Sequence, residues 1–568
     1  MKLFRSVAAV LTAAVLFCVG LPPVQESKAY DREVVYSAFP ASVNGGEPIR
    51  GVDVSSIISI EEAGVVFHDE AGNEADLFRV LYDHDVNYIR VRVWNEPNDG
   101  GGHSYGGGNN DVNTACEIAR RASAYGMKLL VDIQYSDFWA DPAKQQRPKY
   151  WAEHDHDTLA GEIYKWTTWV LTAITEAGGD IGMVQVGNET NCHFCGETDM
   201  YQICDLFKSG DKAVRDFDSS ILIAHHFANP SNVDNYYWYA KVLQECAVDY
   251  DVFATSYYPY WHGTTENLTT VLKTIGDTYG KYVMVAETAY PYTSDDGDTF
   301  GNVVSRDSAE AEFRYDISVD GQAQCLTDVF QAVADCGGKG IGVFYWEPAW
   351  LGVSGKSWQE QSDLWRSHGS GWATEYAAEY DPDVTQAGGS SYDNQALFSF
   401  DGCPLESLDV FTRILPKQEK PEIETTEPET EATQPAADLR TVEITDAVRE
   451  IDREGRIKFG DGGEFRFAGD PHDADGRALS ELRERDRVTI RFTYDTLTGE
   501  IIEIEYLTIE PVRGDLDADR ECSVRDVILL QKWLLHAGEL PDVQSADLNA
   551  DGIVDVFDLA MLKHLLFV

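Results

Sequence analysis

Two glutamates are the residues of this chain whose positions best suit chemistry. Glu189 ends the mainly apolar run 183–189, and Glu287 ends the run 282–287. Two carboxylates at the ends of strands can cleave a glycosidic bond, because one protonates the leaving oxygen while the other attacks the sugar or activates water. Either glutamate alone is equally consistent with a surface residue at a strand end. The elements around them therefore decide the interpretation.

Eight strand-like runs alternate with helical patterns over the first two thirds of the chain. The runs are 51–54, 88–94, 128–133, 183–189, 221–226, 252–258, 282–287 and 341–346. Segments of helical periodicity lie between them, for example 113–125, 158–177 and 324–336. This alternation predicts an α/β fold of the (β/α)8 TIM-barrel type. Active sites of such barrels lie at the carboxyl ends of the strands, where both glutamates stand.

The composition restricts the partners of this protein. Its 568 residues include 97 acidic and 45 basic side chains, which give a formal net charge of −52. Such a charge argues against nucleic acids and anionic membrane surfaces as partners. The 13 Trp, 28 Tyr and 24 Phe residues suit stacking on sugar rings, although they also suit a large core. Composition alone does not separate these two interpretations.

The N-terminus is typical of a secretory signal peptide, predicted here over residues 1–29. Lys2 and Arg5 precede an apolar stretch, 7–21, that is too short for a comfortable membrane span. Ser27–Ala29 offers a small-residue cleavage site, so we expect the mature chain to begin near Tyr30. The sequence thus predicts a secreted, extracellular protein without a membrane anchor.

Changes in composition divide the rest of the chain. We assign residues 30–415 to the barrel domain and 416–437, rich in Pro, Glu and Thr, to a solvated linker. Residues 438–512 alternate apolar and polar side chains, which predicts a small all-β module, a compact barrel or sandwich. Both a glycan-binding role and a spacer role remain open for this module.

A short cysteine cluster, 192–195, follows the Glu189 strand directly. It contains Cys192, His193 and Cys195. A single CxxC pair is weak evidence for zinc, so a metal half-site, a local disulfide and simple loop structure are all open. Loop structure is the interpretation we favour.

Two repeated loops near the C-terminus, 515–526 and 547–558, have the spacing of calcium ligands. Oxygen-bearing side chains occupy positions one, three, five, nine and twelve of each loop, and a helical pattern follows each. The predicted ligands are Asp515, Asp517, Asp519, Ser523 and Asp526, and then Asp547, Asn549, Asp551, Asp555 and Asp558.

This duplicated segment, residues 513–568, resembles a type I dockerin. The resemblance implies an α-helical module with two Ca²⁺ sites that binds a cohesin of a cellulosome scaffold. Arg520 departs from the glycine preferred at its loop position. The pairs implied to face the cohesin, 524–525 and 556–557, differ in sequence, so symmetric two-way docking is not expected. A calcium-stapled structural tail is the alternative.

The barrel itself resembles the arabinogalactan endo-β-1,4-galactanases of glycoside hydrolase family 53 over about residues 49–411. The segments that carry the resemblance are 88–97, 132–145, 186–191, 256–261, 286–290 and 344–350, with 137–142 and 393–398 most specific. It implies hydrolysis of β-1,4-galactan with retention of configuration. Glu287 is then the nucleophile and Glu189 the acid and base, with carboxyl groups roughly 5–5.5 Å apart.

The resemblance also implies a set of substrate-binding residues. Arg90 and Tyr258 would hold the nucleophile, Asn188 would bond the sugar 2-hydroxyl, and Trp346 would form the floor of the subsite for the reacting sugar. Packing at the barrel mouth is the alternative for Arg90, Tyr258 and Trp346, and a buried core histidine is the alternative for His226. The full set is Arg90, Asp132, Tyr135, Trp139, Asn188, His226, Tyr258, Trp261 and Trp346.

A third Ca²⁺ site is implied in the barrel domain, where bacterial members of the family hold calcium. Phe300 stands where those members have a histidine ligand, so an ordinary acidic loop is the alternative. The residues concerned are Asp296, Asp298, Asn302, Ser390 and Asp393. No organic cofactor is expected.

The substrate is less firmly indicated than the mechanism. Gln134 stands where such galactanases usually have histidine, and this change affects a polar contact near the site. Another retaining β-glycanase of the same clan, a cellulase or mannanase, is the alternative enzyme, and a non-catalytic glycan-binding barrel is the alternative outside enzymes. We expect a monomeric catalytic unit associated with a cellulosome.

Overall fold

The computed structural model describes the barrel region continuously and the C-terminal region in parts. The described residues are 32–417, 439–451, 456–459, 463–466, 487–495, 501–509, 516, 524–534, 546, 548, 554 and 562. Contacts divide the chain into two units, 1–421 and 422–568. The predicted signal peptide lies outside the described residues, as does the predicted linker apart from 416 and 417.

Eight parallel strands close into a barrel, which confirms the predicted fold class. Each predicted run overlaps one strand, and consecutive strands are neighbours around the barrel. The strands are β2 (Ile49–Asp53), β3 (Tyr88–Val93), β4 (Lys128–Ile133), β5 (Ile181–Val186), β6 (Leu222–Ala228), β7 (Val252–Ser256), β8 (Tyr282–Thr288) and β9 (Gly340–Trp346). Glu287 therefore lies within β8, whereas Glu189 lies just beyond the end of β5.

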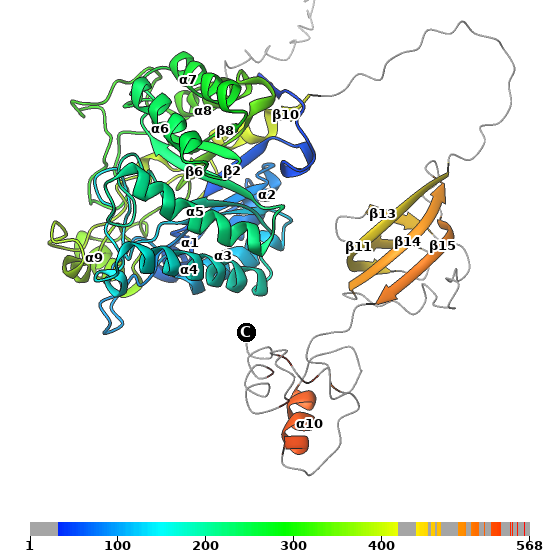
Figure 1. The fold of residues 1–568 in the computed structure, drawn as a ribbon. Helices are drawn as coiled ribbons and strands as arrows, with labels where there is room; N and C mark the ends of the chain where they lie inside the picture. Colours follow the sequence, from blue (N-terminus) through cyan, green and yellow to red (C-terminus); the bar gives the residue numbers. More distant parts are fainter. Residues whose placement is uncertain are drawn as a thin grey trace, which may run out of the picture. The chain divides into compact units, whose positions relative to one another are not determined.

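Helices surround the barrel strands (Figure 1). They are α1 (Ile57–Ala63), α2 (Leu77–Asp83), α3 (Val112–Ser123), α4 (His156–Glu176), α5 (Met200–Phe217), α6 (Val233–Glu245), α7 (Thr265–Tyr279), α8 (Val319–Ala334) and α9 (Trp358–His368). The 3-10 turns are η1 (Asn44–Gly46), η2 (Lys149–Trp151), η3 (Gly337–Lys339), η4 (Glu375–Glu379), η5 (Asp393–Gln395) and η6 (Glu406–Arg413). Asp111, Asp155 and Asp199 cap α3, α4 and α5 by accepting backbone N–H groups, as helix N-termini require.

The interior of the barrel changes from apolar to polar along the strands. Leu130, Met183 and Phe344 belong to a buried apolar cluster in the lower part of the barrel. Two residues further along β4 and β5, Asp132 and Gln185 are also fully buried. Because side chains alternate along a strand, these polar groups point to the same side as the apolar ones, toward the barrel interior. The fold thus places a polar layer directly beneath the carboxyl ends of the strands.

The two ends of the barrel unit pair with each other. Strand β1 (Val34–Tyr36) runs parallel to β10 (Ile414–Pro416), with Val34 opposite Ile414. Arg50, near the start of β2, donates from Nη1 to the Ile414 carbonyl at 3.1 Å. This clasp fixes the last segment of the unit beside its first one.

The segment after the linker contains one antiparallel sheet. Its order is β13–β12–β11–β14–β15, from β11 (Leu439–Ile451), β12 (Arg456–Phe459), β13 (Gly463–Arg466), β14 (Arg487–Asp495) and β15 (Ile501–Ile509). The described strands form an open sheet, not the barrel or sandwich expected. Val488, Ile490 and Phe492 alternate along β14 and are all buried, so one face holds the core. Such alternation fixes the buried face but not whether a sheet closes.

The C-terminal segment contains α10 (Val524–Leu534) and a small apolar core. Leu516, Leu530, Leu548 and Leu562 are buried together, so residues of both repeats share this core. Asp526 is buried, and its Oδ1 accepts the Leu516 N–H at 2.7 Å. The other predicted ligands lie outside the described residues: Asp515, Asp517, Asp519, Ser523, Asp547, Asn549, Asp551, Asp555 and Asp558.

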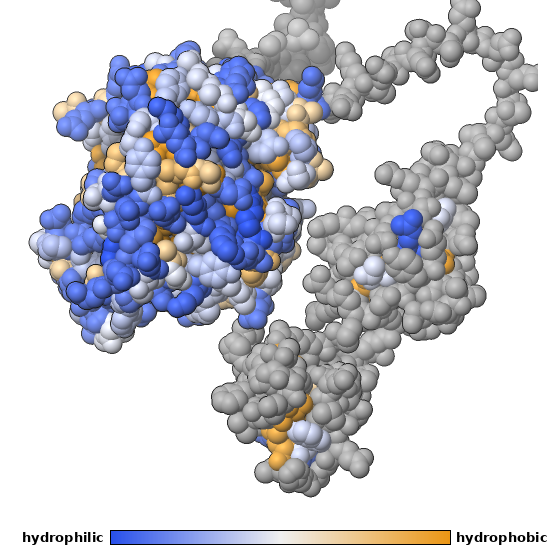
Figure 2. Space-filling model, in the orientation of Figure 1, coloured by the Kyte–Doolittle hydropathy of each residue, from blue (hydrophilic) through white to orange (hydrophobic). Residues whose placement is uncertain are grey.

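The visible face of the barrel unit is mainly hydrophilic, with small apolar areas (Figure 2). This surface agrees with the large excess of acidic side chains in the sequence. Within the part of the chain that the structure describes, no helix combines the length and apolar character needed to cross a membrane.

Candidate active site

A cleft of about 470 Å³ opens at the carboxyl ends of the barrel strands, and both glutamates line it. Several of the predicted site residues meet there. Those that line the cleft are Trp139, Asn188, Glu189, Tyr258, Trp261, Glu287 and Trp346. These predicted residues come from the ends of five different strands and the loops that follow them, and the fold brings them together in one cleft.

Both carboxylate oxygens of Glu287 contact polar side chains at the base of the cleft. Its Oε1 forms an ion pair with Arg90 Nη2 at 2.9 Å, and its Oε2 accepts the Tyr258 hydroxyl at 3.0 Å. Burial, the largest effect, and the charge of Asp53 raise the pKa of Glu287 above its usual value, while the Arg90 guanidinium and the Tyr258 hydrogen bond oppose this rise. The contacts thus favour the ionised form of a carboxyl group that is only 6% exposed.

Glu189 is held in a tight turn after β5. Gly187 and Glu189 have φ angles of 83° and 47°, a left-handed conformation that non-glycine residues rarely adopt. Burial raises the pKa of Glu189 well above its usual value, and the negative charge of Glu287 adds to this effect; a Ser256 hydrogen bond lowers it. The pKa values of both carboxyl groups are raised, but that of Glu189 is raised more strongly, so Glu189 is the better proton donor of the two.

Arg90 lies beneath the cleft and makes no contact with solvent. Nη1 pairs with Asp53 at 2.8 Å, and Nη2 pairs with Asp132 at 2.9 Å. Nη2 also donates to Asn188 Oδ1 at 2.8 Å. Arg90 therefore positions Glu287 and Asn188 from below, and Asp132 acts through Arg90 without reaching the cleft.

Arg92 forms a second buried network that the sequence interpretation missed. It pairs with Asp53 at 3.0 Å and with Glu347 at 2.5 Å. Its guanidinium lies over the rings of Trp139 and Trp346, 4.9 and 5.6 Å from their centroids. Burial raises the pKa of Glu347 to about 7, although Arg92 opposes this shift. The sequence could have predicted this network. Arg92 lies two residues after Arg90 on the same strand, so it also points inward, and a buried arginine needs a carboxylate partner.

Aromatic rings form the walls of the cleft. Trp372 stacks on Trp139 with centroids 4.4 Å apart, and Tyr392 meets Trp346 edge to face at 4.5 Å. Trp372 and Tyr392 both line the cleft and come from the segment after the last barrel strand. Sequence analysis did not single them out, since an aromatic residue in an irregular segment has no periodic pattern to mark its direction.

Like Arg90 and Asp132, two further residues predicted to bind substrate do not line the cleft. His226 is fully buried; its two ring nitrogens lie 2.9 Å from Asn188 Oδ1 and from Ser256 Oγ, and burial lowers its pKa well below the usual value. Tyr135 has a φ of 50°, and its hydroxyl lies 2.7 Å from Thr167 of α4. The positive φ turns Tyr135 toward the helix layer, so the structure does not support a contact with substrate.

Gln134, which stands where the resemblance leads us to expect a histidine, is a well-bonded amide. Its Nε2 donates to Asp132 at 3.0 Å, and its Oε1 accepts from Trp94 Nε1 at 2.7 Å and from the Ala140 N–H at 3.2 Å. Gln134 also lines the cleft. It therefore ties the end of β4 to the loop that carries Trp139.

The acidic loop after β8 converges with η5 on a point suited to a cation. Carboxylate oxygens of Asp296, Asp298 and Asp393 lie within 4.8 Å of one another. Burial raises the pKa of Asp298 to about 6 and that of Asp393 to about 8, and the neighbouring carboxylates add to both shifts. Oδ1 of Asp393 and Oδ1 of Asn302 are buried without hydrogen-bond partners. These oxygen donors fit Ca²⁺.

The neighbouring residues of this loop have other partners. Ser390 donates its N–H to Asp298 at 2.6 Å and its hydroxyl to the Trp350 carbonyl at 2.9 Å. Phe300 packs edge to face on Trp365, with centroids 5.8 Å apart. In this chain Phe300 therefore covers the loop with an apolar ring instead of supplying a ligand.

The cysteine cluster after Glu189 is part of a loop. Cys192 and Cys195 are both free thiols, one exposed and one buried. Cys192 Sγ lies 3.7 Å from the Tyr239 hydroxyl, and Phe194 is fully buried. The local disulfide is thus not formed, and the loop interpretation describes this segment.

A closed (β/α)8 barrel with two glutamates at the ends of its strands defines the class of barrel glycoside hydrolases. Comparison with known families gives the particular one. Residues 49–411 match Glycosyl hydrolase family 53, and the chain belongs to this family. Residues 513–567 match the Dockerin type I domain, so the chain combines a family 53 domain with a C-terminal dockerin.

Individual relatives agree with this assignment. The chain is 53% identical over 366 residues to the "Endo-beta-1,4-galactanase" of Bacillus subtilis, covering 64% of this chain and 85% of the relative. It is 34% identical over 332 residues to the "Arabinogalactan endo-beta-1,4-galactanase" of Cellvibrio japonicus, covering 56% and 84%. The solved "Ignisphaera aggregans GH53 catalytic domain" is 36% identical, with a TM-score of 0.58, covering 67% of this chain and 99% of that one.

We expect Arg90→Met to lower the free energy of unfolding of the barrel unit by about 3–5 kcal/mol, because it leaves the Asp132 and Glu287 carboxylates buried without a paired cation. Chemical denaturation of the full chain measures this change. Arg79→Met is the matched control, since Arg79 forms an exposed pair with Asp83 and its loss should cost much less than that of Arg90. Equal losses for both variants would contradict the role assigned to Arg90.

Proposed function

We propose that the protein is a secreted endo-β-1,4-galactanase that hydrolyses β-1,4-galactosidic bonds of pectic galactan, the type I arabinogalactan, with retention of configuration. The observation that carries the proposal is the asymmetry of the two carboxyl groups. Glu287 is paired with Arg90 and Tyr258, whereas burial and the charge of Glu287 raise the pKa of Glu189. One group is suited to attack and the other to donate a proton. The similarity to named galactanases supports the substrate.

In the first step, ionised Glu287 attacks the anomeric carbon of the sugar while Glu189 donates its proton to the glycosidic oxygen. The bond from the anomeric carbon to that oxygen breaks, and a covalent galactosyl-enzyme forms. The shortened galactan leaves with the proton from Glu189. Arg90 remains charged and holds the second oxygen of Glu287 throughout this step.

In the second step, Glu189 is ionised and removes a proton from a water molecule, which attacks the same carbon from the opposite side to Glu287. The bond to Glu287 breaks, and Glu287 regains its charge. Glu189 is protonated again and ready for the next cycle. Two inversions at one carbon give a product of the starting configuration.

The residues around the pair orient the sugar. Asn188 Nδ2 donates to the Ala140 carbonyl at 2.8 Å, and the amide's second N–H is the donor we assign to the sugar 2-hydroxyl. Trp346 and Trp139 offer flat apolar surfaces, which the Arg92 guanidinium holds in place. We assign Trp261, 38% exposed at the edge of the cleft, to a sugar beyond the cleavage point.

The C-terminal module supports attachment to a scaffold. We propose that its two loops bind Ca²⁺ and that the folded dockerin binds a cohesin, which places the enzyme in a cellulosome outside the cell. Asp526, buried against the backbone of Leu516, belongs to the first of these loops. We also assign a third Ca²⁺ to Asp296, Asp298 and Asp393, where it would neutralise buried carboxylates and fix the loop after β8.

The direct test is release of reducing sugar from linear β-1,4-galactan, cellulose, mannan and xylan, with the anomeric configuration of the first product followed by NMR. We expect oligosaccharides from galactan alone, released as the β-anomer. Glu287→Ala should lower the rate by a factor of about 10⁴ or more.

The exposed residue Glu310 provides a control, because Glu310→Ala removes a carboxylate that does not line the cleft and should leave the rate unchanged. Release of sugar from glucan or mannan instead would keep the mechanism and contradict the substrate. Release of the α-anomer would contradict retention.

Tyr258→Phe should move the acidic limb of the kcat/KM profile to higher pH by about 1 unit. The Tyr258 hydroxyl stabilises ionised Glu287, so its loss raises the pKa of Glu287, and the nucleophile becomes protonated at a higher pH. Tyr257→Phe is the matched control, since the Tyr257 hydroxyl donates to the Gly263 carbonyl at 2.9 Å instead. An unmoved acidic limb in Tyr258→Phe would exclude this role.

Removal of calcium should abolish binding of the full chain to an immobilised type I cohesin. Without Ca²⁺, the ligand carboxylates within the loops repel one another. We expect this repulsion to destabilise the small core around Leu516 and Leu530. Surface plasmon resonance before and after EGTA measures the loss, and added Ca²⁺ should restore binding. Undiminished binding in EGTA would show that attachment does not depend on the loops.

A further inference from the structure

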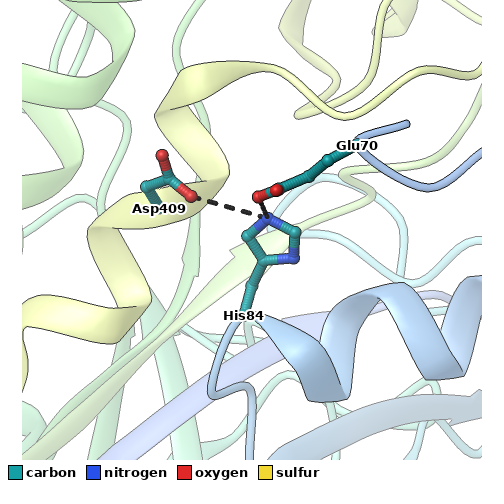
Figure 3. Close-up of side chains that lie close together, drawn as sticks. All are labelled: Glu70, His84 and Asp409. Atoms are coloured by element: carbon teal, nitrogen blue, oxygen red, sulfur yellow. Dashed lines mark ion pairs between the residues drawn. The ribbon is translucent and has the colours of Figure 1, made fainter. Parts of the chain in front are cut away.

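Outside the cleft, three side chains from distant parts of the barrel unit converge on one point. They are Glu70, from the loop between α1 and α2, His84, directly after α2, and Asp409 of η6 (Figure 3). One ligand atom from each lies within 4.8 Å of the other two. None of the three lines the catalytic cleft.

The tautomer of His84 is fixed by its surroundings. Its Nδ1 lies 2.7 Å from the Val80 carbonyl oxygen, which only accepts hydrogen bonds, so Nδ1 carries a proton. In the neutral ring, Nε2 then presents a lone pair. The side chain is buried, with 5% of the residue exposed, so Nε2 has little access to water.

The lone pair of His84 faces two carboxylates. Nε2 lies 3.3 Å from Glu70 Oε1 and 3.5 Å from Asp409 Oδ1 (Figure 3). Three acceptors thus meet without a donor, which is unfavourable unless a cation lies among them. A proton on Nε2 would serve one carboxylate at a time, and both distances exceed the 2.7–2.9 Å usual for a charge-assisted hydrogen bond.

A metal ion satisfies all three atoms together. Zn²⁺ binds imidazole nitrogen and carboxylate oxygen at about 2.0–2.2 Å in tetrahedral geometry, which separates neighbouring ligand atoms by roughly 3.3–3.5 Å. The two observed distances from Nε2 fall in this range. The protonated Nδ1 bonded to a backbone carbonyl is also the usual arrangement of a metal-binding histidine.

We propose that Glu70, His84 and Asp409 form a binding site for a divalent transition-metal ion of the Zn²⁺ class, with water as the fourth ligand. The imidazole distinguishes this site from the all-oxygen cluster after β8, because calcium prefers oxygen ligands. Glu70 is well exposed, with 76% of its side chain accessible, so ion and water have an open route to the site.

The position of the site indicates a structural role. Asp69 accepts the backbone N–H groups of Ala71 and Asn73, at 3.0 and 2.8 Å, so the turn that carries Glu70 is ordered before any metal binds. Asp409 belongs to η6, which packs on α8 near the end of the barrel unit. A metal ion here would link the start of the barrel to its last segment and raise thermal stability without changing hydrolysis.

The test counts zinc bound by the full chain in buffer saturated with Ca²⁺, which keeps the oxygen-rich sites filled. Isothermal titration calorimetry and metal analysis after gel filtration should show one Zn²⁺ fewer in Glu70→Gln and in Asp409→Asn than in the wild type. The wild type should also show a zinc-dependent rise in melting temperature that both variants lack. Zinc bound at any other site is the same in the wild type and in the variants, so it does not affect the difference in zinc content between them.

His103→Gln is the matched control, because exposed His103 pairs with Asp99 at 2.7 Å without a third ligand. It should bind as much zinc as the wild type. Glu70→Gln changes an exposed side chain and should fold normally even if Asp409→Asn does not. Equal zinc content and equal zinc-dependent stability in the wild type and Glu70→Gln would overturn the proposal. The three side chains would then form an ion-paired cluster without a metal ion.

Discussion

Burial of the Arg90 guanidinium at the centre of the barrel is the constraint on which the catalytic domain depends. Taking a guanidinium out of water costs several kcal/mol unless carboxylates surround it with good geometry. Asp53, Asp132 and Glu287 provide that compensation from three different strands. The ends of these strands must therefore stay in register for the charge to be tolerated. The interactions that hold the barrel mouth together are the same ones that orient Glu287, the proposed nucleophile.

The charge balance of this layer explains why its carboxyl groups behave differently. Burial raises the pKa of Asp132 to about 6 and that of Glu347 to about 7, and the charges of neighbouring carboxylates add to both shifts, because Arg90 and Arg92 face more carboxylates than they can neutralise. Within residues 32–417, no cation forms an ion pair with Glu189. Burial and the charge of Glu287 therefore act on Glu189 without a paired cation to oppose them, which agrees with the proposed role of Glu189 as the proton donor.

Much of the fold and part of the site followed from the sequence. Alternating apolar runs predicted the eight strands and placed Glu189 and Glu287 at their ends, since strand periodicity is a local property. Contacts between distant segments had no such signal. Trp372 and Tyr392 come from irregular chain, and the direction of Tyr135 depends on one positive φ angle. Likewise, the alternation in the β module fixed its strands but left open whether the sheet closes.

The clasp between β1 and β10 also decides where the chain leaves the catalytic unit. Arg50, at the amino end of β2, bonds the Ile414 carbonyl, so Pro416 and the exit of the chain lie at the amino ends of the barrel strands. The cleft opens at the carboxyl ends. The last described residues of this unit, up to 417, therefore lie at the end of the barrel opposite the cleft. In the scaffold-bound enzyme that we propose, a pull on the segment after Pro416 would act first on the short β1–β10 pair, remote from Glu189 and Glu287.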